Sequence, residues 1–212
     1  DVSSMLVGEI ADPKPGDYII DVCAAPGGKS IHLADRLAGT GHVEARDLTE
    51  YKTALIRENI DRMGMKNITA VQMDASVQDA SSVSKADIVI ADLPCSGLGV
   101  LGKKTDLKYR VTEKQLEDLV RLQRSILDVV CGYVKPGGVL IYSTCTINRA
   151  ENQENVEWFL AEHPDFAPEQ LKESLCAQLQ GAVGEDSCLQ LLPGVHDSDG
   201  FFIARLRKKG SA

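Results

Sequence analysis

The chain has 212 residues, a formal net charge of −8, and 43% hydrophobic against 25% charged residues. This length suits one α/β domain with a single core, and the composition excludes a disordered or fibrous protein. No apolar run approaches the roughly 20 residues that cross a bilayer, and the first residues lack a signal-peptide pattern. We therefore expect a cytoplasmic, monomeric protein without a membrane partner.

The six cysteines exclude two further classes of protein. They are widely scattered, at Cys23, Cys95, Cys131, Cys145, Cys176 and Cys188. Without a secretory signal, such spacing argues against a disulfide framework. Because the cysteines form no CxxC pair, we also expect no structural zinc site and no other metal.

The acidic charge argues against a domain that grips nucleic acid by charge alone, since that affinity comes mainly from Lys and Arg contacts to phosphates. Basic residues nevertheless cluster in residues 102–110 and again in residues 205–209. Solvated surface is the commoner explanation for such clusters, and a basic rim on an acidic body is the alternative.

Strand-like and helix-like segments alternate along the chain, a pattern typical of a parallel sheet covered on both faces. The expected strands span residues 18–22, 42–46, 67–72, 86–91 and 139–143, the last after a sharp turn at 136–138. The expected helices span about residues 28–37, 51–63, 112–130 and 152–162, with Gly64 as a left-handed cap and a capping box from Thr112 to Gln115. Segments 189–192 and 201–206 fit an antiparallel addition to the sheet edge.

A ligand-binding turn is expected between the first strand and the first helix, where residues 21–30 read DVCAAPGGKS. Glycines there let the backbone approach a ligand closely, and ligands of open α/β sheets lie at the carboxyl ends of the strands. The segment matches neither a P-loop nor a GxGxxG fingerprint. Asp47 follows the second strand, where a carboxylate can bind ribose hydroxyls. Asp74 follows the third strand and could meet an adenine amino group.

Two cysteines follow neighbouring strands. Asp92 and Cys95 come directly after the fourth strand, in DLPCSG, and Cys145 comes directly after the fifth, in STCT. A lone cysteine after a strand is usually a small buried hydrophobe. A doubly wound sheet brings neighbouring strand ends together, so these three side chains should share one cleft as reactive groups.

These motifs make the chain resemble the catalytic domain of the Sun/Fmu (NOL1/NOP2) family of RNA cytosine-C5 methyltransferases. The resemblance rests on CAAPGGK (23–29), DLPCSG (92–97) and STCT (143–146), and it extends over essentially the whole chain. It implies a Rossmann-like class I fold with a mostly parallel seven-stranded sheet and an antiparallel carboxyl-terminal strand. It also implies that residues 1–212 are one catalytic domain, without the amino-terminal RNA-binding region of relatives.

The resemblance further implies a cofactor, S-adenosylmethionine, and a role for each motif residue. Cys145 would attack C6 of the target cytosine, Cys95 would help to remove the C5 proton, and Asp92 would line the methyl-transfer site. Lys29 could orient Asp92 or the cleft, although a lysine at a helix start is as often solvated. The residues expected to bind the cofactor are Cys23, Ala24, Ala25, Pro26, Gly27, Gly28, Lys29, Asp47, Asp74 and Asp92.

The expected partner is RNA, with ribosomal RNA preferred over transfer RNA on resemblance alone. In relatives a basic loop matching residues 103–108 lies beside the RNA. A DNA cytosine-C5 methyltransferase is the nearest rival, but its nucleophile is the cysteine of the Pro-Cys motif, and no second cysteine like Cys145 is expected there. A noncatalytic RNA-assembly module is the rival of a different class, and the complete motifs argue against it.

Overall fold

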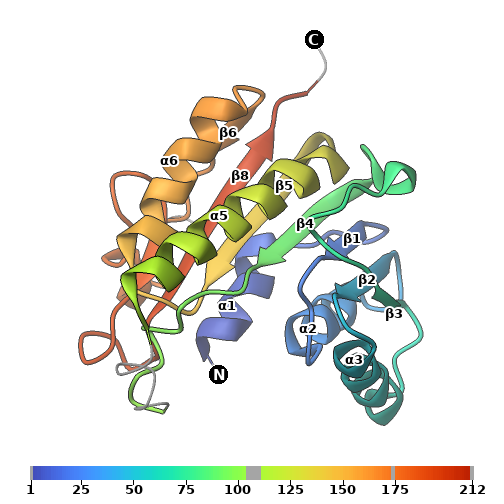
Figure 1. The fold of residues 1–212 in the computed structure, drawn as a ribbon. Helices are drawn as coiled ribbons and strands as arrows, with labels where there is room; N and C mark the ends of the chain where they lie inside the picture. Colours follow the sequence, from blue (N-terminus) through green and yellow to red (C-terminus); the bar gives the residue numbers. More distant parts are fainter. Residues whose placement is uncertain (1, 104–110, 173–174, 211–212) are drawn as a thin grey trace.

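The computed structural model describes residues 2–103, 111–172 and 175–210, which form one mixed sheet between two layers of helices (Figure 1). Its strands are β1 (Tyr18–Asp21), β2 (His42–Asp47), β3 (Ile68–Gln72), β4 (Ala86–Asp92), β5 (Val134–Thr144), β6 (Phe166–Pro168), β7 (Leu189–Leu191) and β8 (Phe201–Lys208). The helices are α1 (Val2–Ala11), α2 (Gly28–Arg36), α3 (Glu50–Met63), α5 (Glu113–Val130), α6 (Gln153–Glu162) and α7 (Ala177–Gln180). Three 3₁₀ turns complete the elements: η1 (Ala80–Ser82), η2 (Cys131–Tyr133) and η3 (Arg149–Glu151).

The strand order places a topological switch point at the centre of the sheet. The strands stand in the order β3-β2-β1-β4-β5-β8-β6, with β7 also paired to β8. β1 to β5 are parallel, whereas β8 runs antiparallel to β5. The chain moves outward from β1 through β2 to β3 and then returns to β4 on the other side of β1. The carboxyl ends of β1 and β4 therefore flank the switch point at which open α/β sheets bind ligands.

Both faces of the sheet are buried, which explains the continuous apolar runs in its central strands. In β4, Ile88 and Ile90 pack on the face covered by α1, α2 and α3. Val89 and Ala91 point to the opposite face, which α5 and α6 cover. The predicted α/β class is confirmed, as are the glycine cap at Gly64 and the capping box at Thr112. None of the described helices has the length and apolarity needed to cross a membrane.

The sheet has eight strands in the described residues rather than the predicted seven. β6 pairs with residues 206–208 of β8 and β7 with residues 201–203. Because β5 already pairs with one edge of β8, the two short strands share the other edge. The predicted segments 189–192 and 201–206 correspond to β7 and β8. A three-residue strand such as β6 is too short to show a periodic pattern.

Two further features differ from the sequence prediction. Residues 136–138 do not precede the fifth strand but lie within β5, where the register with β4 shifts between Ala86 and Ile88. Helix α1 was not predicted, because its ten residues depend on contacts that only the folded chain supplies. Val7 and Ile10 are buried against the sheet, and the Arg205 guanidinium donates to the backbone carbonyl of Ile10 at the end of this helix.

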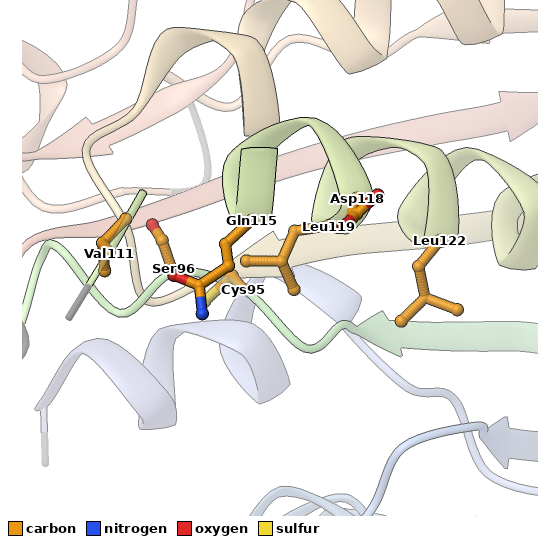
Figure 2. Close-up of a pocket in the computed structure, with 7 residues that line it drawn as sticks. All are labelled: Cys95, Ser96, Val111, Gln115, Asp118, Leu119 and Leu122. Atoms are coloured by element: carbon orange, nitrogen blue, oxygen red, sulfur yellow. The ribbon is translucent and has the colours of Figure 1, made fainter. Parts of the chain in front are cut away.

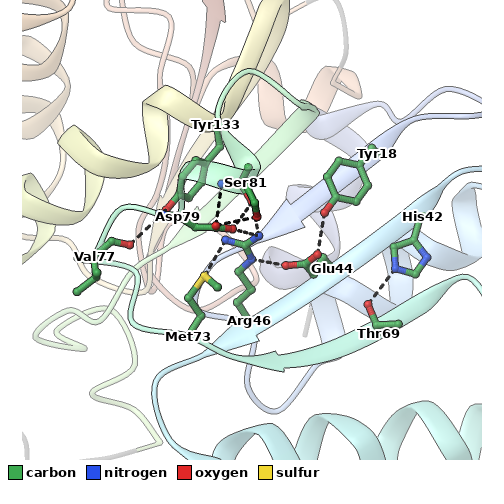
Figure 3. A network of polar contacts seen from close by, with 11 residues as sticks. Tyr18, His42, Glu44, Arg46, Thr69, Met73, Val77, Asp79, Ser81 and Tyr133 are labelled. Atoms are coloured by element: carbon green, nitrogen blue, oxygen red, sulfur yellow. Dashed lines mark hydrogen bonds and ion pairs between the residues drawn. The ribbon is translucent and has the colours of Figure 1, made fainter.

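A buried arginine fixes the end of β2 (Figure 3). Arg46 is 3% exposed, and its Nε lies 2.6 Å from Oε1 of Glu44. Its Nη2 donates to Oγ of Ser82 at 2.6 Å and to Oδ2 of Asp79 at 3.3 Å. The guanidinium thus ties β2 to the loop that precedes η1, directly beside Asp47.

Replacement of this arginine should destabilise the fold. Arg46→Leu leaves the Glu44 and Asp79 carboxylates without their cation, so the free energy of unfolding in urea should fall by about 3 kcal/mol. Arg57→Leu is the matched control, because Arg57 pairs with Glu50 on the exposed face of α3 at 2.5 Å and such pairs stabilise little. Equal losses in both variants would contradict a structural role for the Arg46 network.

Candidate active site

The pairing of β4 with β5 brings the two cysteine loops together. Asp92, the last residue of β4, stands opposite Ser143 in the parallel register. The Ser143 hydroxyl donates to Oδ1 of Asp92 at 2.8 Å, and the backbone N–H of Leu93 donates to the carbonyl of Ser143 at 3.1 Å. The loops that follow the two strands therefore begin side by side, at the predicted edge of the sheet.

Cys95 and Cys145 meet in this cleft, with 3.2 Å between their sulfur atoms. Both side chains are half-buried. The hydrogen bond from the Cys95 thiol lowers the pKa of Cys145, and the nearby Lys29 ammonium lowers it further, against burial and the Asp92 charge. The same contact and burial raise the pKa of Cys95. Of the two sulfurs, Cys145 is therefore the one that loses its proton more readily.

Lys29 provides the positive charge beside this pair. It lies in the first turn of α2, and its Nζ is 2.7 Å from Oδ2 of Asp92, so of the alternatives that the sequence left open the structure has the contact with Asp92. The ammonium also lies 5.5 Å from the centre of the Phe201 ring on β8. Burial lowers the pKa of Lys29, but the Asp92 and Asp21 carboxylates raise it more, so the group stays charged.

The predicted binding segment 23–29 forms the loop between β1 and α2 together with the first two residues of that helix. Gly27 has φ +104°, a left-handed conformation that other residues adopt only with strain. The backbone N–H of Ala25 donates to Oδ2 of Asp47 at 3.0 Å, so the loop is tied to the end of β2. At the end of β1, burial raises the pKa of Asp21 to about 7. Oδ2 of Asp21 accepts from the Ser30 hydroxyl at 2.6 Å.

Asp74 lies beyond β3 at the same edge of the sheet but is exposed. Its Oδ1 accepts from the backbone N–H of Ser76 at 2.9 Å and from the Ser76 hydroxyl at 2.6 Å. These hydrogen bonds lower the pKa of Asp74. The structure therefore places Asp74 in a tight turn, farther from the cysteine cleft than Asp47, which is buried at the end of the adjacent strand.

Residues 9–207 match the model of a protein family described as 16S rRNA methyltransferase RsmB/F. The chain belongs to this family. Its members are S-adenosylmethionine-dependent methyltransferases with a Rossmann-like fold, so the predicted family and cofactor are both confirmed.

Individual relatives support the same assignment. The chain is 42% identical over 211 residues to the probable ribosomal RNA small subunit methyltransferase B of Bacillus subtilis. The aligned region covers 99% of this chain and 47% of that protein. It is 36% identical to a tRNA (cytosine(72)-C(5))-methyltransferase of Pyrococcus horikoshii, over 97% of this chain and 50% of the relative. The crystal structure of NSun6 from Pyrococcus horikoshii superposes with a TM-score of 0.84 at 33% identity, over 99% of this chain and 52% of that one. The chain spans about half the length of these relatives.

A pocket of about 420 Å³ opens beside Cys95 (Figure 2). It lies between the loop after β4 and the first turns of α5, and Leu119 and Leu122 of that helix form part of its wall. Among the described residues, its lining is Cys95, Ser96, Val111, Gln115, Asp118, Leu119 and Leu122. This family member therefore has a mainly apolar space next to one of its two cleft cysteines.

The sequence prediction missed Glu151, a fully buried carboxylate beneath the cysteine loops. It accepts hydrogen bonds from Ser96, the residue after Cys95. The one sequence signal for it is Asn148 followed three residues later by a glutamate, which is a helix-capping pattern and does not point to an active site.

The structure describes little of the first basic cluster and all of the second. Residues 104–110, which carry most of the first cluster, lie outside the described residues; Lys103 pairs with Asp199 at 2.6 Å. In the second cluster, Arg205 and Arg207 on β8 both pair with Glu169, at 2.5 and 2.8 Å. These two arginines therefore serve mainly to hold the sheet edge together.

The charge balance of the cleft predicts the order in which its cysteines react. Iodoacetamide should alkylate Cys145 at lower pH than Cys95, with a midpoint below the usual value of about 8.5 for a free thiol. Lys29→Gln should move the Cys145 midpoint to higher pH, because a cation that stabilises the thiolate is removed. Lys66→Gln, at an exposed position after α3, is the control. Mass spectrometry of the alkylated peptides measures both rates, and an unchanged midpoint in Lys29→Gln would contradict the assignment.

Proposed function

We propose that this chain is the catalytic domain of an enzyme that methylates C5 of a cytosine in RNA. The observation that carries the proposal is the 3.2 Å contact between Cys95 and Cys145, at the ends of two paired strands and beside the ion pair of Lys29 with Asp92. A thiolate is both a strong nucleophile and a good leaving group, as a transient bond to a pyrimidine ring requires. A noncatalytic assembly module has no use for such a cleft.

The groups at the switch point fit S-adenosylmethionine. Oδ1 of Asp21 is buried and has no hydrogen-bond partner among the described residues, and at Gly28 the space that a Cβ would take is open. We assign the loop 23–29 to the methionine part, Asp47 to the ribose and Asp74 to the adenine. When bound, the cofactor would supply a methyl group on a positively charged sulfur; the nucleophilic carbon would bond to this methyl group, and the sulfur would leave as a neutral thioether.

Cys145 acts on the target cytosine as the nucleophile. Its thiolate forms a bond to C6, and the electrons of the C5–C6 double bond move onto C5, which becomes the nucleophilic carbon. Asp92 lies beside this thiolate, and its carboxylate contacts the amino group or the ring nitrogen of the cytosine. Lys29 holds this carboxylate in place. The base must leave any stack to enter this cleft, so an opened or single-stranded RNA segment is the substrate form.

Cys95 completes the reaction as the base. Its pKa is raised by the hydrogen bond to Cys145 and by the charge on that sulfur. Once Cys145 is bonded to C6, this charge is gone, and Cys95 can lose its proton to solvent. The Cys95 thiolate then takes the proton from C5, the C5–C6 double bond re-forms, and the Cys145 thiolate leaves. A DNA enzyme with only a Pro-Cys nucleophile would not need the second sulfur.

The proposed substrate is ribosomal RNA, supported by the family description and by the Bacillus subtilis relative. Transfer RNA is the second candidate, since a relative of similar identity is named for a tRNA cytosine. Bisulfite sequencing of RNA from cells with and without the gene should show one cytosine in small-subunit ribosomal RNA that loses protection. Loss of protection in transfer RNA alone would replace the first substrate with the second.

Mutation of the two cysteines should have opposite consequences. Cys145→Ala should abolish methyl transfer, because no bond to C6 can form. Cys95→Ala should leave enzyme covalently attached to methylated RNA, which appears as a retarded band on a denaturing gel. An adduct with Cys145→Ala instead would reverse the two roles, and unchanged transfer by both variants would remove the two-cysteine scheme. Cys176→Ala, at an exposed position, is the control.

The ribose contact predicts a loss of cofactor affinity. Asp47→Asn replaces a carboxylate that already accepts from the backbone N–H groups of Ala25 and Leu48, so the amide nitrogen must face one of these donors. Titration calorimetry should show S-adenosylmethionine bound at least about tenfold more weakly, the effect of one hydrogen bond to a charged group. Asp35→Asn, on the exposed side of α2, should bind normally. Equal affinity in both variants would contradict the ribose assignment.

A further inference from the structure

Glu151 is a buried carboxylate with every acceptor position in use. It ends η3, and its side chain is fully buried. Oε2 accepts from the backbone N–H of Ser96 at 2.9 Å and from Nε2 of Gln123 at 3.0 Å. Oε1 accepts from the Ser96 hydroxyl at 2.5 Å and from Nδ2 of Asn148 at 3.1 Å. All four donors are neutral groups, so the carboxylate is held by hydrogen bonds.

These bonds join the two loops that carry the cysteines. Ser96 follows Cys95, and Thr146 follows Cys145. The hydroxyl oxygens of Ser96 and Thr146 are 2.8 Å apart. Because Ser96 donates its proton to Glu151, the Thr146 hydroxyl must donate to Ser96. A single chain of hydrogen bonds therefore runs from the Cys145 loop through the Cys95 loop to the carboxylate.

Gln123 secures the same loop from the α5 side. Its Nε2 donates to the carbonyl of Pro94 at 2.9 Å as well as to Glu151. The Cys95 loop is thus held on both sides of the cysteine, at Pro94 and at Ser96. A buried carboxylate costs free energy to desolvate. Here its hydrogen bonds offset that cost and hold the Cys95 loop in place.

We propose that Glu151 is a positioning residue for the reaction, and that its carboxylate sets the separation of the Cys95 and Cys145 sulfurs by holding Ser96 and, through it, Thr146. This inference rests on the proposed two-cysteine function. The side chain has no direct contact with either sulfur among the described residues. Its effect passes through the backbone that each cysteine shares with its neighbour.

A glutamine cannot replace this carboxylate, although it has the same shape. Whichever of the two oxygen positions the glutamine NH₂ group took, it would face two hydrogen-bond donors there. At the Oε2 end one of these donors is a backbone N–H, which cannot be reversed. At the Oε1 end the Asn148 amide would have to turn, and its Oδ1 already accepts from the backbone N–H of Ala150 at 3.2 Å. Either arrangement breaks a hydrogen bond and displaces a loop.

The test compares Glu151→Gln with Glu154→Gln, an exposed position in the first turn of α6. In Glu151→Gln, the Cys145 alkylation midpoint should move to higher pH, because the hydrogen bond from Cys95 weakens. The kcat for methyl transfer should fall about a hundredfold, the scale expected for a misplacement near 1 Å, with the KM for S-adenosylmethionine unchanged. Glu154→Gln should match the wild type in all three measurements.

Thr146→Val keeps the carboxylate and removes only the hydroxyl link, so it decides the matter if Glu151→Gln does not fold. It should shift the alkylation midpoint in the same direction by a smaller amount. An unshifted midpoint in a folded Glu151→Gln protein, or in Thr146→Val, would overturn the inference. Alkylation needs no RNA, so if the wild type transfers no methyl group, the proposed function fails while the positioning role is still decided by the midpoints.

Discussion

The parallel pairing of β4 with β5 is the constraint on which the whole site depends. It places Asp92 opposite Ser143, and their side chains share a hydrogen bond. Both strands are buried on both faces, so a one-residue slip would turn every core side chain the wrong way. The two loops that leave these strands therefore begin side by side, and their sulfurs meet at 3.2 Å.

Two polar contacts lie near this pair of sulfurs and differ in kind. Lys29 pairs with Asp92 and lowers the pKa of Cys145. The Glu151 side chain instead accepts four hydrogen bonds from neutral donors among the described residues. A cation thus lies near the cysteine pair within a domain of net charge −8.

Much of the fold could be predicted from the sequence because its central elements carry strong local signals. The buried strands are continuous apolar runs, and α3 and α5 have caps at Gly64 and Thr112 that the structure confirms. Helix α1 and strand β6 could not be predicted, since each exists through its partners: Arg205 and the core for the helix, and β8 for the strand. The bulge at residues 136–138 depends on the register with β4, which no local pattern encodes.

The sequence by itself determined the family, the cofactor and the neighbourhood of Asp92, Cys95 and Cys145, because short motifs at strand ends carry that information. Only the tertiary structure lowers the pKa of Cys145, since this depends on Lys29 and on a contact with Cys95 across fifty positions of chain. It also revealed Glu151, whose proposed role lies in hydrogen bonds to Ser96 and Gln123, both far from it in sequence. A motif records which groups are present, whereas charge and hydrogen bonding depend on what folding places beside them.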